Sequence, residues 1–292
     1  MAVAVKNKSC CFKSVVGCFM IPAFSLMLML LATTPLYAQS YNELATEGTK
    51  QLEAGNYDAA ITNYTRAIAV DSLNSINEYL YANLAQAYMK KGDVGKVEEL
   101  LKSALVRFPQ SKVLFLQSAN FHLSQDKREK ALREYNKVLS LEPRNEEALY
   151  FRAYILAGKK KYDLAREDYY TILAVNPDNN KAQFALALLY AKEGNENQAL
   201  LALDNLIEKN PDNPEYYMAC SDIEKESKRY ELALIYIDEG IKKCKDNYTL
   251  RLEKAELLVA MNKYEETKRV LDALSSDGYY SPRMKILYKK IK

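Results

Sequence analysis

The chain has 292 residues, of which 49% are hydrophobic and 27% are charged, and it contains only nine glycines and eight prolines. These proportions are typical of a folded soluble protein and exclude a disordered or fibrous chain. Of the 41 basic residues, three lie before Tyr41, which leaves 38 to balance the 38 acidic residues. Affinity for nucleic acid depends on clustered positive charge, so we expect no nucleic-acid partner.

The N-terminal segment has the pattern of an export signal. Three lysines precede a stretch over residues 14–34 that contains no charged residue, as in a secretory signal peptide. We expect residues 1–38 to be a signal peptide cleaved after Ala38. The alternative is an uncleaved N-terminal anchor, because about 20 apolar residues span a bilayer. Either arrangement places the rest of the chain outside the cytoplasm, in the periplasm or cell envelope. We expect membrane contact only if the N-terminal segment stays uncleaved.

Short polar residues recur along the rest of the chain at a nearly constant step. After a first step of 37 residues, each step is 34, and the positions are Ser40, Asn77, Ser111, Asn145, Asn179, Asn213, Asn247 and Ser281. Such side chains cap helix N-termini. A second series keeps the same step two residues before four of these caps, at Pro109, Pro143, Pro177 and Pro211. We therefore expect repeated units to start at residues 41, 78, 112, 146, 180, 214 and 248, and a last short helix over residues 282–292.

Within each unit, small and large residues alternate at matched positions. The eighth residues are small and are Gly48, Ala85, Ala119, Ala153, Ala187, Ser221 and Ala255. The twentieth residues are mostly alanine, and the twenty-fourth are large and apolar, namely Tyr64, Leu101, Tyr135, Tyr169, Leu203, Ile237 and Leu271. Small residues let two helices approach closely, and a large residue one turn further on lies on the same helical face.

This pattern resembles the tetratricopeptide repeat, a helical hairpin of 34 residues with small, aromatic and proline residues at these places. The resemblance extends over seven units. It implies an all-α fold, a right-handed superhelical solenoid of about seven helical hairpins over residues 39–281, closed by a capping helix over residues 282–292. Stacked repeats bury their apolar faces against their neighbours, so such units occur in series.

Residue types that carry catalysis or bind metals are scarce. His122 is the only histidine and lies at a packing position of its unit, so we expect it in the core. Cys220 and Cys244 are the only cysteines after residue 38, and their places in the unit put them too far apart for a disulfide. We expect both to be buried thiols. The sequence therefore predicts no enzyme activity, no cofactor and no metal site.

The resemblance implies that the first helices of the units line a concave groove through their second, fifth, ninth and twelfth residues. In the middle units, the fifth and ninth residues form an apolar strip bordered by polar residues. The predicted site residues are Leu116, Asn120, Tyr150, Tyr154, Phe184, Leu188, Met218 and Asp222. Apolar strips with polar rims commonly bind partners. The opposite interpretation is that a tightly wound superhelix buries the strip by itself.

Within this strip, we expect Tyr150, Tyr154 and Phe184 to anchor a partner, and Asn120 and Asp222 to orient it by hydrogen bonds. Some members of the family bind a terminal carboxylate with a lysine and an asparagine at the fifth and ninth positions. No unit of this chain has that pair, so binding of this kind is not expected.

Three functional hypotheses follow from these residues. The first is an exported, non-enzymatic scaffold or adaptor that binds a protein or peptide partner in the bacterial cell envelope. The second is a periplasmic receptor for a glycan or another small ligand, because aromatic faces also stack on sugar rings. The third, an enzyme, has no positive support in the sequence. The identity of the partner and the oligomeric state stay open.

Overall fold

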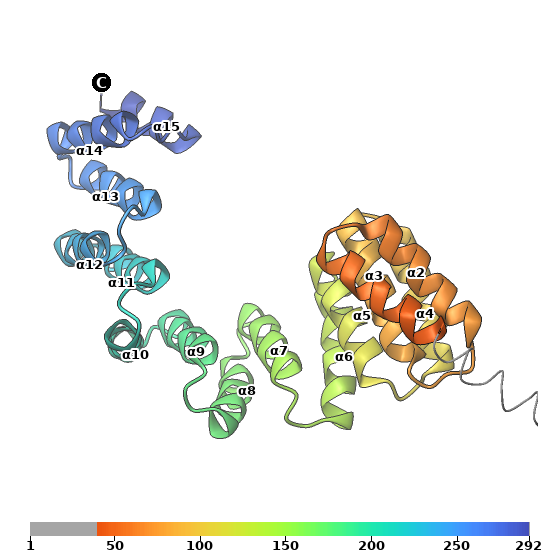
Figure 1. The fold of residues 1–292 in the computed structure, drawn as a ribbon. Helices are drawn as coiled ribbons and strands as arrows, with labels where there is room; N and C mark the ends of the chain where they lie inside the picture. Colours follow the sequence, from red (N-terminus) through yellow and green to blue (C-terminus); the bar gives the residue numbers. More distant parts are fainter. Residues whose placement is uncertain (1–39, 292) are drawn as a thin grey trace, which may run out of the picture. The chain divides into compact units, whose positions relative to one another are not determined.

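The computed structural model describes residues 40–291, and the regular structure of this part is helical throughout (Figure 1). The predicted signal peptide, residues 1–38, lies outside the described residues. A helix over residues 40–53 is followed by α2 (Tyr57–Val70), α3 (Asn77–Lys91), α4 (Val94–Arg107), α5 (Lys112–Ser124), α6 (Arg128–Leu141), α7 (Glu146–Gly158), α8 (Tyr162–Val175), α9 (Asn180–Lys192), α10 (Glu196–Lys209), α11 (Pro214–Glu226), α12 (Tyr230–Lys243), α13 (Tyr248–Ala260), α14 (Tyr264–Ser276) and α15 (Pro282–Lys290). The predicted all-α repeat fold is confirmed.

By its internal contacts the described part of the chain divides into two compact units, one that ends at Ala104 and one that begins at Leu105, and the boundary falls within α4. In the first unit, the core includes Tyr41, Tyr64 and Leu84. In the second unit, each helix from α5 to α14 packs against the next one along the chain, and α15 packs against α13 and α14. All eight predicted site residues lie in this second unit.

Most of the predicted cap residues start helices as expected. In each of six helices, the cap side chain accepts a hydrogen bond from a backbone N–H of the first turn, at 2.9 to 3.3 Å. These residues are Ser111, Asn145, Asn179, Asn213, Asn247 and Ser281. Two of the helices, α11 and α15, also have proline in their first turn, where the missing N–H costs least.

The prediction that Asn77 caps a helix was wrong. Asn77 lies inside α3 and is fully buried, and the residue before that helix, Ile76, makes no capping bond. The Asn77 amide instead donates to the carbonyl oxygen of Asp71 at 2.7 Å and accepts from the hydroxyl of Tyr41 at 2.9 Å. The first step of 37 residues leaves room for a turn before α3, and the partly buried carbonyl of Asp71 in this turn needs a donor. Asn77 supplies it.

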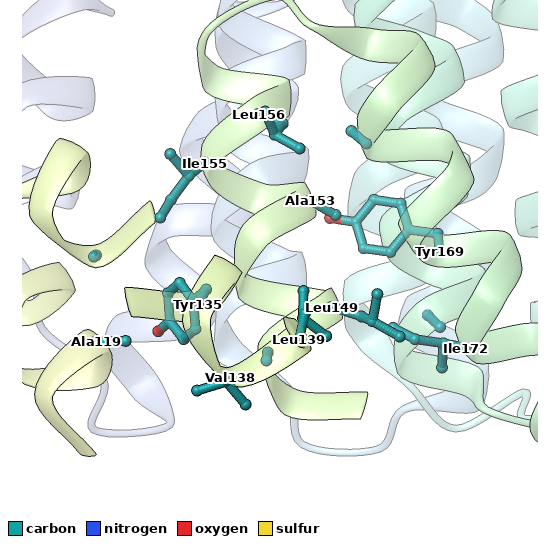
Figure 2. Close-up of a cluster of buried hydrophobic side chains, with 14 of the residues drawn as sticks. Ala119, Tyr135, Val138, Leu139, Leu149, Ala153, Ile155, Leu156, Tyr169 and Ile172 are labelled. Carbon is teal, nitrogen blue, oxygen red and sulfur yellow. The ribbon is translucent and has the colours of Figure 1, made fainter. Parts of the chain in front are cut away.

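The alternation of small and large residues is a packing feature, as predicted. Ala119, Tyr135, Ala153 and Tyr169 belong to one buried cluster of the second unit (Figure 2). In the first unit, the corresponding position is Gly48, where an added Cβ would lie 2.7 Å from the ring of Tyr64. In the first repeat, the eighth residue is therefore small because the ring of Tyr64 at the twenty-fourth position occupies the space beside it.

The second unit ends in a helix with one apolar side. Met284 and Leu287 of α15 are buried against Leu252 and Leu271, while Lys285 and Lys289 are exposed. This arrangement closes the apolar end of the repeat stack. None of the helices in residues 40–291 has the length and apolar character needed to cross a membrane.

Candidate partner-binding site

The eight predicted site residues lie in the compact unit that begins at Leu105. They are on four successive helices, each of which is the first helix of its repeat. Each helix contributes two residues four positions apart, which places both on one helical face. We call this set the first-helix stripe; α5 carries Leu116 and Asn120, α7 carries Tyr150 and Tyr154, α9 carries Phe184 and Leu188, and α11 carries Met218 and Asp222.

The first-helix stripe is half-buried rather than covered. Tyr154 is 48% exposed and Asp222 is also exposed, whereas the other six residues are intermediate. Tyr150 packs against the buried cluster that contains Tyr169. Phe184 packs against the cluster that contains Tyr216, and Met218 packs against the one that contains Tyr217. The protein's own side chains therefore support the stripe from below without burying it completely.

Tyr150 is the centre of an aromatic group on α7 and α8. Its ring meets Phe151 edge-on at 5.4 Å between centroids and Tyr169 edge-on at 5.8 Å. Burial is the main cause that raises the pKa of the Tyr150 hydroxyl, followed by the nearby charges that Tyr154 and Glu215 can carry. The hydroxyl therefore stays neutral near physiological pH and can donate a hydrogen bond.

The polar members of the stripe are held by neighbouring side chains. Asn120 accepts a hydrogen bond from the hydroxyl of Tyr135 at 2.6 Å and donates one to Glu147 at 2.7 Å. An amide with one bond at each end keeps a further donor and a further acceptor, so Asn120 has capacity for a partner's backbone. Asp222 accepts from Lys225 at 2.6 Å, which partly neutralises its charge.

Lys181 was not predicted as a site residue, but it lies over the aromatic group from the next repeat. Its ammonium nitrogen is 4.0 Å from the ring centroid of Tyr150 and 5.3 Å from that of Phe151. Lys181 is the second residue of its unit. The family resemblance places that position in the groove, but the apolar strip is defined by the fifth and ninth residues alone. A comparison of the second residues, Glu147, Lys181 and Glu215, would have found it.

The residues considered for chemistry lie in the core. His122 is buried, with its Nδ1 atom 2.9 Å from a carboxylate oxygen of Glu134, which confirms the predicted core position. Cys220 and Cys244 are both free and buried. Within residues 40–291, no three His, Cys, Asp or Glu side chains gather closely enough to bind a metal ion.

Comparison with known proteins identifies the family. Two family profiles, both described as tetratricopeptide repeat, match the chain, one at residues 51–119 and 156–223 and the other at residues 116–180. Together they span residues 51–223, more than half of the chain. The chain therefore belongs to the tetratricopeptide repeat family, whose repeats form scaffolds for protein–protein interaction.

A curated relative is "DnaJ homolog subfamily C member 7 homolog" from Dictyostelium discoideum, 30% identical over 102 residues. The match covers 35% of this chain and 19% of that protein, so the chain spans about a fifth of the length of the curated relative.

Several solved structures share the fold. A tetratricopeptide repeat protein from Parabacteroides merdae is 23% identical with a TM-score of 0.68, covering 87% of this chain and 99% of that one. PilW, described as a widely conserved type IV pilus biogenesis factor, is 17% identical with a TM-score of 0.61, covering 74% and 99%. YrrB, described as having an unusual peptide-binding site, is 18% identical with a TM-score of 0.53, covering 68% and 97%. At these identities the likeness shows the fold alone.

Proposed function

We propose that the chain is a non-enzymatic adaptor that binds a peptide segment of a protein partner along the first-helix stripe. The observation that carries the proposal is the half-buried apolar row, with Tyr154 48% exposed, between the polar groups of Asn120 and Asp222. Aromatic residues on a rigid support lose little conformational freedom on binding, which makes them effective anchors. The structure of YrrB, a protein of the same fold, is described as having a peptide-binding site.

The second part of the proposal concerns location. The charge and hydropathy pattern of residues 1–38 supports export, so we propose that the adaptor acts in the periplasm or cell envelope of a bacterium. An epitope tag at the C-terminus of the full chain tests this by fractionation of the producing cells. Recovery of the tag with cytoplasmic markers alone would refute the location without affecting the binding proposal.

The binding proposal is tested by site-specific crosslinking in intact cells. A photoreactive amino acid replaces Tyr154 in the full chain, and a matched control replaces Tyr264, which is 43% exposed and lies on the second helix α14. We expect a discrete crosslinked protein from position 154 that is absent from position 264. The double variant Tyr150→Ala and Phe184→Ala, with the photoreactive residue still at position 154, should lose this product.

Equal labelling from both positions would overturn the binding proposal. A panel of glycans distinguishes the second hypothesis, a receptor for sugars. If a glycan raises the melting temperature of the wild-type chain but not that of Tyr154→Ala, and no protein is crosslinked, the stripe binds sugar rather than peptide.

A further inference from the structure

We propose that Lys181 makes the first-helix stripe selective for a peptide with an acidic side chain next to an aromatic or aliphatic one. This inference rests on the proposed function and names the chemistry of the partner. The acidic group would bind the Lys181 ammonium, and the apolar neighbour would lie against Tyr154 and Leu188.

The first observation is the position of the ammonium group. The Lys181 nitrogen lies 4.0 Å from the Tyr150 ring centroid and 5.3 Å from that of Phe151. Cation–π contacts of this kind hold an ammonium group over an aromatic face. The flexible lysine side chain is thereby directed toward Tyr150, which is itself a member of the stripe.

The second observation is that this charge has no counter-ion. In the described part of the chain Lys181 forms no ion pair, whereas two nearby basic residues do. Arg152 on α7 is paired with Asp168, and Lys225 on α11 is paired with both Asp222 and Glu253. An aromatic face leaves the hydrogen-bond donors of the ammonium unsatisfied on its outer side, so an incoming carboxylate can bind there.

The third observation is that Lys181 is locally unfavourable. It lies in the first turn of α9, which begins at Asn180, and a positive charge there opposes the helix dipole. The equivalent positions in the preceding and following repeats are acidic, Glu147 and Glu215. A residue that breaks a local rule without an ion-pair partner is more readily explained by binding than by stability.

Two neighbouring glutamates, Glu147 and Glu215, affect how strongly Lys181 can prefer an acidic peptide. Glu147 is already hydrogen-bonded to Asn120, so it is engaged elsewhere. Glu215 is close enough to Tyr150 to contribute to its raised pKa, and its carboxylate therefore competes with an acidic ligand for this region. We expect Glu215→Gln to increase the affinity for acidic peptides.

The test uses a library of short synthetic peptides with amidated C-termini, presented to the immobilised full chain. The enrichment of each residue type at each position is measured for the wild type and for variants. We expect aspartate or glutamate to be enriched over asparagine or glutamine by roughly twofold to fivefold, the range of an exposed ion pair, next to an enriched aromatic or aliphatic residue. Lys181→Gln should abolish the acidic preference, and Lys181→Glu should replace it with a preference for lysine or arginine.

The matched control is Lys192→Gln, an exposed lysine in the last turn of the same helix, which should leave the preference unchanged. Far-UV circular dichroism checks that each variant is folded. If Lys181→Glu does not fold, the result for Lys181→Gln decides.

The two proposals fail in different ways. If the wild type enriches no peptide relative to the double variant Tyr154→Ala and Phe184→Ala, the proposed function is wrong. If peptides are enriched but acidic residues are not, or if the acidic preference persists in Lys181→Gln, only the present inference is overturned. It is also overturned if basic peptides are preferred, or if a parallel library with free C-termini is retained through the terminal carboxylate alone.

Discussion

The guanidinium group of Arg152 on α7 binds both carboxylate oxygens of Asp168 on α8, at 2.9 and 2.6 Å. The Asp168 side chain is only 6% exposed. The same guanidinium donates to Asn136 on α6 at 2.9 Å. One side chain therefore links the three successive helices α6, α7 and α8, and bidentate pairing of this kind fixes orientation as well as charge.

We predict that Arg152→Met lowers the free energy of unfolding by about 3 kcal/mol, because it leaves the buried carboxylate of Asp168 without a counter-ion. The double variant Arg152→Met and Asp168→Leu should recover most of this loss, since it removes both charges together. Urea denaturation followed by circular dichroism measures both effects. Equal stability of the two variants would contradict the role assigned to the pair.

A second prediction compares two asparagines from the series of predicted cap residues. Asn145→Ala removes one capping bond, to the N–H of Ala148 at 2.9 Å, and should cost about 1 kcal/mol. Asn77→Ala leaves the buried hydroxyl of Tyr41 and the partly buried carbonyl of Asp71 without their partner, and should cost about 2 kcal/mol. Hydrogen exchange resolved along the chain measures each change in its own helix. A smaller loss at Asn77 would mean that water replaces the amide.

These two asparagines also show which structural roles can be predicted from the sequence and which cannot. A cap acts within one turn of its own helix, so its position follows from local spacing, and Asn145 was predicted correctly. The residue type alone does not say whether an amide faces the helix N–H groups or a preceding turn. The role of Asn77 depends on the turn before α3 and on Tyr41, 36 residues away in sequence.

The same limit applies to the candidate site. Helical periodicity places Tyr150 and Tyr154 on one face of α7, because residues four apart share a face. The position of Lys181 over Tyr150 depends on how α9 follows α7 and α8 in space, which a pattern within one unit does not contain. The pairing of Arg152 with Asp168 joins two helices in the same way and was not predicted.

A third prediction concerns Gly48, the eighth residue of the first repeat. Gly48→Ala should destabilise the protein by about 1 to 3 kcal/mol, because the new methyl group would lie 2.7 Å from a ring carbon of Tyr64, and overpacking of a core has this cost. The matched control is Gly95→Ala in α4, where an added Cβ meets nothing within 4 Å. Alanine has the higher helix propensity there, so this variant should be neutral or slightly stabilising. Thermal melts compare the two, and a stabilising Gly48→Ala would show that the ring can move.

The last prediction is a loss of stability at high pH that originates in buried tyrosines. Burial raises the pKa of Tyr217, which is fully buried, from its ordinary value of 10.0 to about 12. Between these values the unfolded chain loses the phenolic proton while the folded chain retains it. The contribution of this group to stability is therefore fully present below pH 10 and falls as the pH rises toward about 12.

Tyr217→Phe removes the ionising group and should reduce this alkaline loss. The variant should also lose about 1 kcal/mol near neutral pH, because the hydroxyl donates to the carbonyl of Pro211 at 2.9 Å. Denaturant melts of both proteins across this pH range test the prediction, and an unchanged alkaline slope in Tyr217→Phe would assign the loss to other tyrosines.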